Sequence, residues 1–250
     1  MDANAVKAIL FDLDNTLIET HRAGRYAIQK VVFSCSKTQE LLKTSLALDD
    51  DTITNICDKF KQKLLHENFD PTAGRSIDEV RVGHWEDSIK ESVDSCSTSS
   101  LAHQCYYLWK NTRLELLNLS PEISSLLKQL RRKYKLLLLT NGNAQTQREK
   151  VDAASCEGFF DSIVLAGDYA EQKPFPSIFR LCFDLLQVEP QDCIMVGDSL
   201  DTDIQGGWSA HVRATVWINS AGDAVPVGSV TPDFTLSTVL DLEDVLAQLK

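Results

Sequence analysis

No run of apolar residues approaches the roughly 20 that a membrane-spanning helix needs. The first residues also lack the charged start and the long apolar stretch of a signal peptide. Basic residues are outnumbered, 25 against 36 acidic ones, and the net charge of −11 disfavours binding to nucleic acid or to an anionic membrane. These absences predict a soluble cytoplasmic protein whose partner is a small molecule.

No C-x-x-C pair occurs among the seven cysteines, which are scattered along the chain. Neither a disulfide framework nor a thiolate zinc site is indicated, and we interpret the cysteines as reduced, mostly structural thiols. The 250 residues suffice for one large domain or two smaller ones, with a sizeable core in either case. The sequence leaves the oligomeric state open.

What is present after residue 120 is an alternation of apolar strands and helices. Ser120, Pro121 and Glu122 combine a cap residue, a first-turn proline and a first-turn acid, and they predict a helix that ends near Tyr134. Residues 6–11 form a nearly continuous apolar run, typical of a strand buried on both faces. The alternation predicts an α/β fold with a doubly wound, Rossmann-like parallel sheet. Further strands are expected at residues 136–139, 163–166, 193–196 and 214–218, and further helices at 143–154, 177–186, 204–210 and 240–249.

Residues 18–119 have a different pattern, with apolar residues at helical spacing, as in Ile53, Ile56 and Phe60. We expect four or so helices here, which form a small bundle inserted after the first strand. Residues 70–76 include proline and glycine and predict a loop between the second and third helices. The predicted domains are an α/β core, residues 1–17 and 120–250, and a helical cap, residues 18–119. Predicted helix caps are Asp49 to Asp51, Asp78, and the Ser/Thr cluster at residues 95–100.

Polar side chains follow the buried strands, at the edge where open α/β sheets bind their ligands. Asp12 and Asp14 come directly after the first strand, and Thr140 with Asn141 follows the second. Thr140 and Asn141 offer a hydroxyl, an amide and a loop that an anion can approach closely, and Lys173 adds a positive charge. Each feature alone also fits an ordinary turn or a solvated lysine, so only their combination predicts a phosphate site.

A second predicted strand, residues 193–196, is also followed by an acid: Gly197 and then Asp198 come directly after it. Oxygen ligands from Asp12, Asp198 and a main-chain carbonyl, completed by water and phosphate oxygens, suit Mg²⁺. We predict phosphoryl transfer in which Asp12 attacks phosphorus in line and forms a covalent aspartyl phosphate. Asp14 would protonate the departing oxygen and then take a proton from the attacking water.

These motifs resemble the haloacid dehalogenase superfamily of phosphatases, and the resemblance covers essentially the whole chain. Asp12-Leu13-Asp14-Asn15-Thr16 resembles the first motif, Thr140 the second, Lys173 the third, and Gly197-Asp198 the start of the fourth. Either Asp201 or Asp203 would be the second acid of the fourth motif, and Asp203 is favoured because it opens the following helix. The resemblance implies that Asp12 and Asp14 are catalytic, that Leu13, Thr140, Asn141 and Lys173 bind phosphate, and that Asp12, Asp14 and Asp198 hold magnesium.

The insertion lies where one branch of that superfamily carries its cap. Within it, residues 81, 84–86 and 108–110 resemble a phosphatase whose substrate is a small sugar phosphate that also carries a carboxylate. Arg75 and Arg81 are candidates for binding this carboxylate, because a guanidinium holds a carboxylate through two hydrogen bonds. His84 and Trp85 are candidates for lining the same pocket. An arginine on a solvated helix face and a tryptophan packed between helices explain these residues at least as well, so all four stay outside the predicted site.

Three alternatives remain. The same fold would serve a nucleoside monophosphate or phosphoglycolate phosphatase. A phosphoacceptor signalling module also places carboxylates, a threonine and a lysine around magnesium, but it has no leaving alcohol for Asp14 to protonate and no substrate for an insertion to enclose. Hydrolytic dehalogenation needs neither a metal nor a leaving-group acid, so Asp14 and Asp198 disfavour it.

Overall fold

The computed structural model describes residues 5–28, 37–93 and 98–249. The chain divides into two compact units: Met1–Glu19 with Asn118–Lys250, which we call the α/β unit, and Thr20–Leu117, which we call the helical unit. The sequence predicts boundaries after residues 17 and 119, which differ from these by two residues each. The roles of catalytic core and cap stay predictions.

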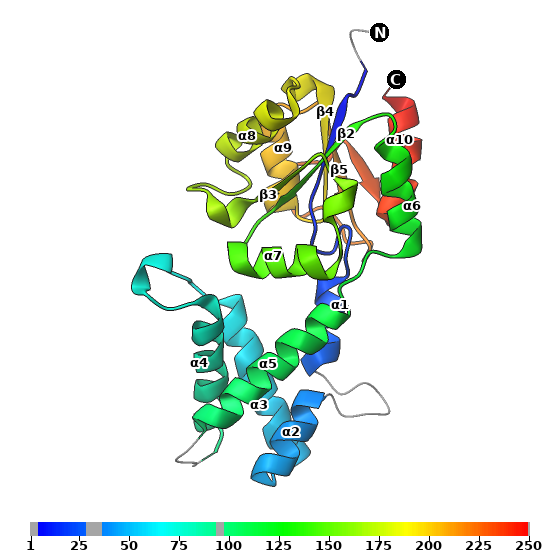
Figure 1. The fold of residues 1–250 in the computed structure, drawn as a ribbon. Coiled ribbons are helices and arrows are strands. Elements are labelled where there is room, and N and C mark those ends of the chain that lie inside the picture. Colours follow the sequence, from blue (N-terminus) through cyan, green and yellow to red (C-terminus); the bar gives the residue numbers. More distant parts are fainter. Residues whose placement is uncertain (1–4, 29–36, 94–97, 250) are drawn as a thin grey trace. The chain divides into compact units, whose positions relative to one another are not determined.

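The α/β unit contains a six-stranded sheet in which every neighbouring pair of strands is parallel (Figure 1). The strand order is β3-β2-β1-β4-β5-β6, which confirms the predicted doubly wound sheet. Phe11 pairs with Leu138 on one side and with Val196 on the other, so three strands end side by side. The strands are β1 (Ala8–Phe11), β2 (Lys135–Thr140), β3 (Ser162–Leu165), β4 (Cys193–Gly197), β5 (Ala214–Ile218) and β6 (Phe234–Leu236).

Helices cover both faces of this sheet. Ala8 and Leu10 pack in a core cluster with Phe179, while the alternate residues Ile9 and Phe11 are buried on the opposite face. Burial on both faces explains the continuous apolar run of β1. In Figure 1, α8 and α9 lie on one side of the sheet and α6 and α10 on the other. The helices are α6 (Pro121–Leu130), α7 (Ala144–Ala153), α8 (Pro176–Leu186), α9 (Gln205–Ser209) and α10 (Leu242–Gln248).

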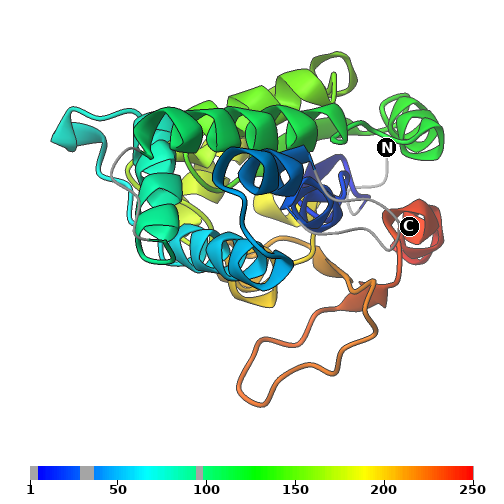
Figure 2. The same ribbon diagram turned by 90° about the horizontal axis from the view of Figure 1, so that it is seen from below.

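Helix α6 begins as predicted but ends earlier. Ser120 Oγ accepts a hydrogen bond from the Ile123 N–H at 3.2 Å, and Pro121 is the first helical residue. The helix ends at Leu130 rather than near Tyr134, because the chain turns there to enter β2. Strand β6 is absent from the prediction, since three partly exposed residues give no apolar run. Residues 219–233, between β5 and β6, form a long exposed loop that extends away from the sheet (Figure 2).

The helical unit has five helices within the described residues, where the sequence predicts four or so. Its core centres on Phe60, whose ring stacks on Trp85 at 4.2 Å between centroids and meets Trp109 edge-on at 5.2 Å. Trp85 is fully buried and is therefore a core residue. Ile53, Ile56 and Phe60 are buried along α3, as their spacing predicts. The helices are α1 (Thr20–Ile28), α2 (Lys37–Leu46), α3 (Asp50–Leu65), α4 (Ile77–Lys90) and α5 (Ser99–Glu115).

The predicted caps of these helices are correct in one case and wrong in another. Asp49 caps α3, and its carboxylate accepts a hydrogen bond from the Thr52 N–H at 2.7 Å. Ser76, not Asp78, caps α4, because Ser76 forms a reciprocal capping box with Glu79. The predicted 70–76 loop precedes this helix. The third cap cluster lies partly outside the described residues, which resume at residue 98.

None of the helices in the described ranges is long and apolar enough to cross a membrane. The five cysteines within those ranges are buried free thiols, and burial raises the pKa of Cys105, Cys156, Cys182 and Cys193 to about 12. Such thiols stay protonated and unreactive at neutral pH. Cys35 and Cys96 lie outside the described residues.

Candidate active site

Asp12 stands at the carboxyl end of β1. Its N–H still pairs with the neighbouring strand and donates to the Val196 carbonyl at 2.9 Å. The chain then turns through Asn15, whose φ of 57° lies in the left-handed region that asparagine tolerates better than most residues. The Thr16 hydroxyl donates back to Asp12 Oδ2 at 3.3 Å. The turn thus holds the Asp12 carboxylate at the end of the strand.

Lys173 is the cation that contacts the buried carboxylates Asp12 and Asp203. Its Nζ lies 2.6 Å from Asp12 Oδ1, 2.7 Å from Asp203 Oδ1 and 2.8 Å from the Leu139 carbonyl oxygen. The Lys173 side chain is only 1% exposed. The lysine therefore joins the first and fourth sequence motifs through a buried ion-pair network.

The loop after β2 positions this lysine. Asn141 Nδ2 donates to the Lys173 carbonyl at 2.8 Å, and the Lys173 N–H donates to Asn141 Oδ1 at 2.9 Å. The amide predicted to bind phosphate is thus engaged with the main chain of Lys173. The Thr140 hydroxyl beside it is buried and has no hydrogen-bond partner in the described part of the chain. The Leu13 side chain is fully buried, which leaves its main chain for the predicted phosphate contact.

Three carboxylates meet at the ends of β1 and β4. Asp12, Asp198 and Asp203 each have an oxygen within 4.8 Å of the others. Asp203 is buried, and its Oδ2 accepts a hydrogen bond from the Ser199 N–H at 3.0 Å. Gly197 makes this approach possible, since a Cβ there would lie 2.2 Å from Asp203 Oδ2. Asp201 is exposed, so the favoured acid of the fourth motif is the one within the cluster.

Burial, together with the neighbouring charges, shifts the pKa values of the three acids in this cluster. Burial raises the pKa of Asp12 to about 7 although Lys173 lowers it, and the carboxylates of Asp203 and Asp14 raise it further. Burial also raises the pKa of Asp198 to about 6, with Asp12 adding to the effect. The pKa of Asp203 is raised by burial in spite of Lys173. A divalent cation among these oxygens would restore the ionised carboxylates, so the donor set fits magnesium.

The carboxylate of Asp14 lies outside this cluster, in contact with α7. Lys150 Nζ is 2.6 Å from Asp14 Oδ2 and 2.8 Å from Oδ1, and Gln147 Nε2 donates to Oδ2 at 3.0 Å. Gln147 and Lys150 are three residues apart on one face of the helix, and both are buried. Sequence reasoning missed this pair, because the burial of both residues depends on where α7 packs and no local pattern signals it. The predicted metal contact of Asp14 stays a prediction.

The sequence model of one family, described as haloacid dehalogenase-like hydrolase, matches residues 6–211. The chain belongs to this family. N-acylneuraminate-9-phosphatase of Rattus norvegicus is 44% identical over 249 residues, which cover 100% of this chain and 97% of the relative. The enzyme of the same name from Homo sapiens is 43% identical over the same coverage. The chain is therefore a phosphatase of the haloacid dehalogenase family.

Solved structures agree with the fold. The haloacid dehalogenase hydrolase YfnB from Bacillus subtilis, determined with bound magnesium, matches with a TM-score of 0.68 and 20% identity over 97% of this chain and 99% of that one. A 2-haloacid dehalogenase from Pseudomonas syringae matches with a TM-score of 0.64 and 24% identity, over 98% and 100%. At these identities the likeness concerns the fold alone.

Proposed function

We propose that this phosphatase hydrolyses N-acetylneuraminate 9-phosphate to N-acetylneuraminate and inorganic phosphate. The observation that carries the proposal is the 43–44% identity with N-acylneuraminate-9-phosphatases over the whole chain, the helical unit included. The site motifs of the α/β unit alone would not select a substrate. Phosphatases with other substrates share less, such as the glyceraldehyde 3-phosphate phosphatase of Pyrococcus abyssi at 25% identity over 85% of this chain and 81% of that one.

Asp12 is the proposed nucleophile. One of its carboxylate oxygens forms a bond to phosphorus while the bond between phosphorus and O9 of the sugar breaks, which gives an aspartyl phosphate and the sugar alcohol. The Lys173 ammonium group lies 2.6 Å from Asp12 Oδ1. Its positive charge reduces the repulsion between the Asp12 carboxylate and the phosphate of the substrate. Thr140 is the proposed donor of a hydrogen bond to a phosphate oxygen, and its support is a buried hydroxyl with no hydrogen-bond partner among the described residues.

Asp14 is the proposed acid and base. It gives a proton to the departing O9 and later takes one from the water that attacks phosphorus, so that phosphate leaves and Asp12 is restored. Lys150 and Gln147 hold the Asp14 carboxylate at 2.6 and 3.0 Å, which makes them positioning residues for this step. Neither touches the reacting atoms in this proposal.

Mg²⁺ is the proposed cofactor, held by the Asp12 and Asp198 carboxylates and the main-chain carbonyl of Asp14. Asp198 is only partly buried, whereas Asp203 is engaged by Lys173 at 2.7 Å and by the Ser199 N–H at 3.0 Å. We therefore assign Asp203 to positioning Lys173 rather than to direct metal ligation. When bound, the ion supplies positive charge that offsets the phosphate and the carboxylates.

The test is phosphate release from N-acetylneuraminate 9-phosphate beside a panel of sugar phosphates, nucleoside 5′-monophosphates and phosphoglycolate, with Mg²⁺ and with EDTA. We expect the highest kcat/KM for N-acetylneuraminate 9-phosphate and no turnover in EDTA. A higher kcat/KM for another ester would refute the substrate, and full activity in EDTA would refute the cofactor. The nucleotide alternative has weaker support: pyrimidine 5′-nucleotidase YjjG of Escherichia coli matches 55% of this chain at 29% identity.

A further inference from the structure

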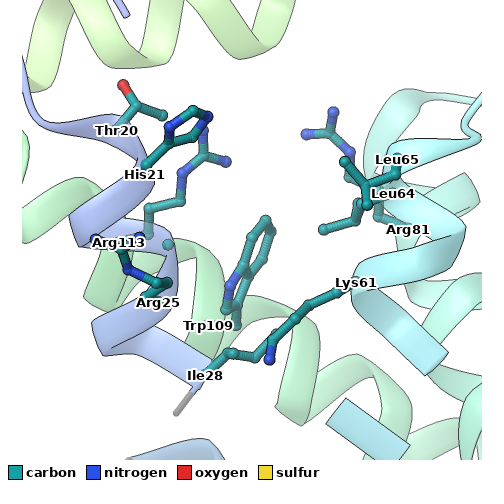
Figure 3. Close-up of a pocket in the computed structure, with 11 residues that line it drawn as sticks. Thr20, His21, Arg25, Ile28, Lys61, Leu64, Leu65, Arg81, Trp109 and Arg113 are labelled. Carbon is teal, nitrogen blue, oxygen red and sulfur yellow. The ribbon is translucent and has the colours of Figure 1, made fainter. Parts of the chain in front are cut away.

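The helical unit contains a cavity of about 470 Å³, and both arginines that the sequence suggests for binding a carboxylate are engaged within that unit. Arg81 lines the cavity, in which Trp109 lies between the lining residues of α1 and those of α3 and α4 (Figure 3). Arg81 forms a two-pronged ion pair with Glu67, with Nη2 2.9 Å from Oε1 and Nε 3.0 Å from Oε2. Arg75 does not line the cavity and donates to the Glu79 carbonyl at 3.2 Å. The binding of a carboxylate by either arginine stays a prediction.

The α/β unit contains a buried polar atom that has no role in the proposed reaction, the Oε1 of Gln147. Gln147 lies near the start of α7, one turn after Asn143, which caps the helix. The side chain is held between two loops, because Nε2 donates to Asp14 Oδ2 at 3.0 Å and also to the Asn141 carbonyl. The residue as a whole is 4% exposed. Gln147 thus lies where the Asp14 carboxylate meets the loop after β2.

The hydrogen bonds of Gln147 fix which way its amide faces. An ionised carboxylate and a main-chain carbonyl only accept hydrogen bonds, so the atom that contacts both must be the nitrogen. The oxygen is therefore left as an acceptor, and none of the described residues donates to it. A buried acceptor without a donor costs free energy, so such atoms in native proteins usually meet a water molecule or a ligand. The partner expected for Gln147 Oε1 is a donor that enters the site during the reaction.

A water molecule that contacts Asp14 is close enough to be that donor. The nitrogen and the oxygen of a side-chain amide are about 2.3 Å apart, so Gln147 Oε1 lies no more than about 5.3 Å from Asp14 Oδ2. A water whose two O–H groups donate at about 2.8 Å bridges two oxygens that are about 4.5 Å apart. That span lies within the limit, so one water can contact the Asp14 carboxylate and Gln147 Oε1 together.

We propose that Gln147 Oε1 accepts a hydrogen bond from the water that attacks phosphorus, while Asp14 takes the other proton of that water. The inference rests on the proposed function, in which Asp14 is the base of the hydrolytic step, and it adds the acceptor that selects the nucleophile. In this step a bond forms between the water oxygen and phosphorus, the bond between phosphorus and the Asp12 oxygen breaks, and one proton moves to Asp14. The second hydrogen stays on the attacking oxygen and is held by Gln147.

An alcohol lacks this second hydrogen. When an alcohol attacks the aspartyl phosphate, its one O–H proton goes to Asp14, and Gln147 Oε1 is left without a donor. The arrangement therefore favours transfer of the phosphoryl group to water over transfer to an alcohol, including the sugar that has just been released. Gln147 makes the enzyme a hydrolase rather than a phosphotransferase.

The test measures how the phosphoryl group divides between two nucleophiles. The magnesium-loaded enzyme turns over p-nitrophenyl phosphate in aqueous methanol, and the initial rates of formation of methyl phosphate and inorganic phosphate are measured together. We expect Gln147→Met to raise the ratio of methyl phosphate to inorganic phosphate by about fivefold or more, the effect of one hydrogen bond lost from the water reaction. Gln147→Glu, which keeps an oxygen acceptor, should leave the ratio near that of the wild type although turnover falls. Gln147→Leu replaces the methionine variant if circular dichroism shows that the latter is unfolded.

Lys150→Met is the matched control, because Lys150 contacts the same Asp14 carboxylate, at 2.6 Å, and Asp14 serves both nucleophiles. It should slow both reactions and leave the ratio nearly unchanged. An unchanged ratio in Gln147→Met would overturn the assignment, and so would an equal rise in Lys150→Met, since a displaced Asp14 would then explain the effect. If the wild type does not hydrolyse N-acetylneuraminate 9-phosphate, the proposed substrate is wrong, and the ratio measured with p-nitrophenyl phosphate still decides the role of Gln147.

Discussion

Replacing Lys173 with methionine tests the charge balance of the candidate site. Methionine keeps most of the volume of the side chain but removes the ammonium that lies 2.6 Å from Asp12 Oδ1 and 2.7 Å from Asp203 Oδ1. The two carboxylate side chains are 8% and 1% exposed, so they lose their partner without gaining water. Removing one partner of a buried ion pair lowers stability by about 3–5 kcal/mol. We expect a loss of that size in the free energy of unfolding at pH 8 in EDTA.

The loss should be smaller at pH 5. The pKa of Asp12 is about 7 in the folded protein against an ordinary value of 3.8, so the folded state binds a proton that the unfolded state releases. Such a group stabilises the fold fully below its unfolded pKa, and this contribution is lost as the pH rises through the folded pKa. Lys173 lowers the pKa values of Asp12 and Asp203, and its removal raises them further. At pH 5 the Asp12 carboxyl of the variant is therefore neutral and needs the lysine less.

Urea denaturation at pH 5 and pH 8, in EDTA, measures both losses. Lys7→Met is the matched control, because Lys7 pairs with Asp192 at 2.9 Å but its side chain is 55% exposed. A surface pair of this kind contributes less than about 1 kcal/mol. The reasoning is refuted if Lys173→Met loses no more stability than Lys7→Met, or if its loss is the same at the two pH values.

The other predictions concern turnover. Asp12→Asn should abolish hydrolysis while the circular dichroism spectrum stays unchanged, because the amide has nearly the same shape but is not a competent nucleophile; near-normal activity would exclude the covalent route. Asp14→Asn should lower kcat/KM for N-acetylneuraminate 9-phosphate by about 10²–10⁴ and that for p-nitrophenyl phosphate far less, since only the sugar alkoxide needs the proton. Lys150→Met should show the same selectivity to a smaller extent, and equal losses on both esters would remove it from the positioning role. Calcium titrated at fixed magnesium should inhibit competitively, because calcium readily takes both oxygens of a carboxylate and would turn Asp12 off its line of attack; full activity with calcium alone would contradict this.

The α/β unit could be predicted from the sequence because its signals are local. The apolar run of β1 requires burial on both faces, and a carboxylate directly after such a strand must lie at the carboxyl edge of a parallel sheet. The registers of β1, β2 and β4 then bring Asp12, Thr140 and Asp198 to one edge. The meeting of these residues follows from strand pattern and topology alone.

The partners of Asp14 could not be predicted in the same way. Lys150 lies 136 positions after Asp14 in the chain. Its burial depends on where α7 packs rather than on any local pattern. Arg81 presents the same difficulty in the helical unit, since only the folded bundle brings Glu67 to it. The cap of α4 is a smaller case: Ser76 and Asp78 both suit an N-terminal turn, and the capping box with Glu79 decides between them.

The two hydrogen bonds between Asn141 and the main chain of Lys173 join the loop after β2 to the loop after β3. They fix the backbone of the lysine, while Asp12 and Asp203 fix its ammonium group. The orientation of this positive charge is therefore established when the chain folds and does not have to be found again in each turnover. A preorganised charge of this kind needs little rearrangement as a substrate's charge shifts, so in the proposed reaction it would lower the reorganisation energy of the chemical step.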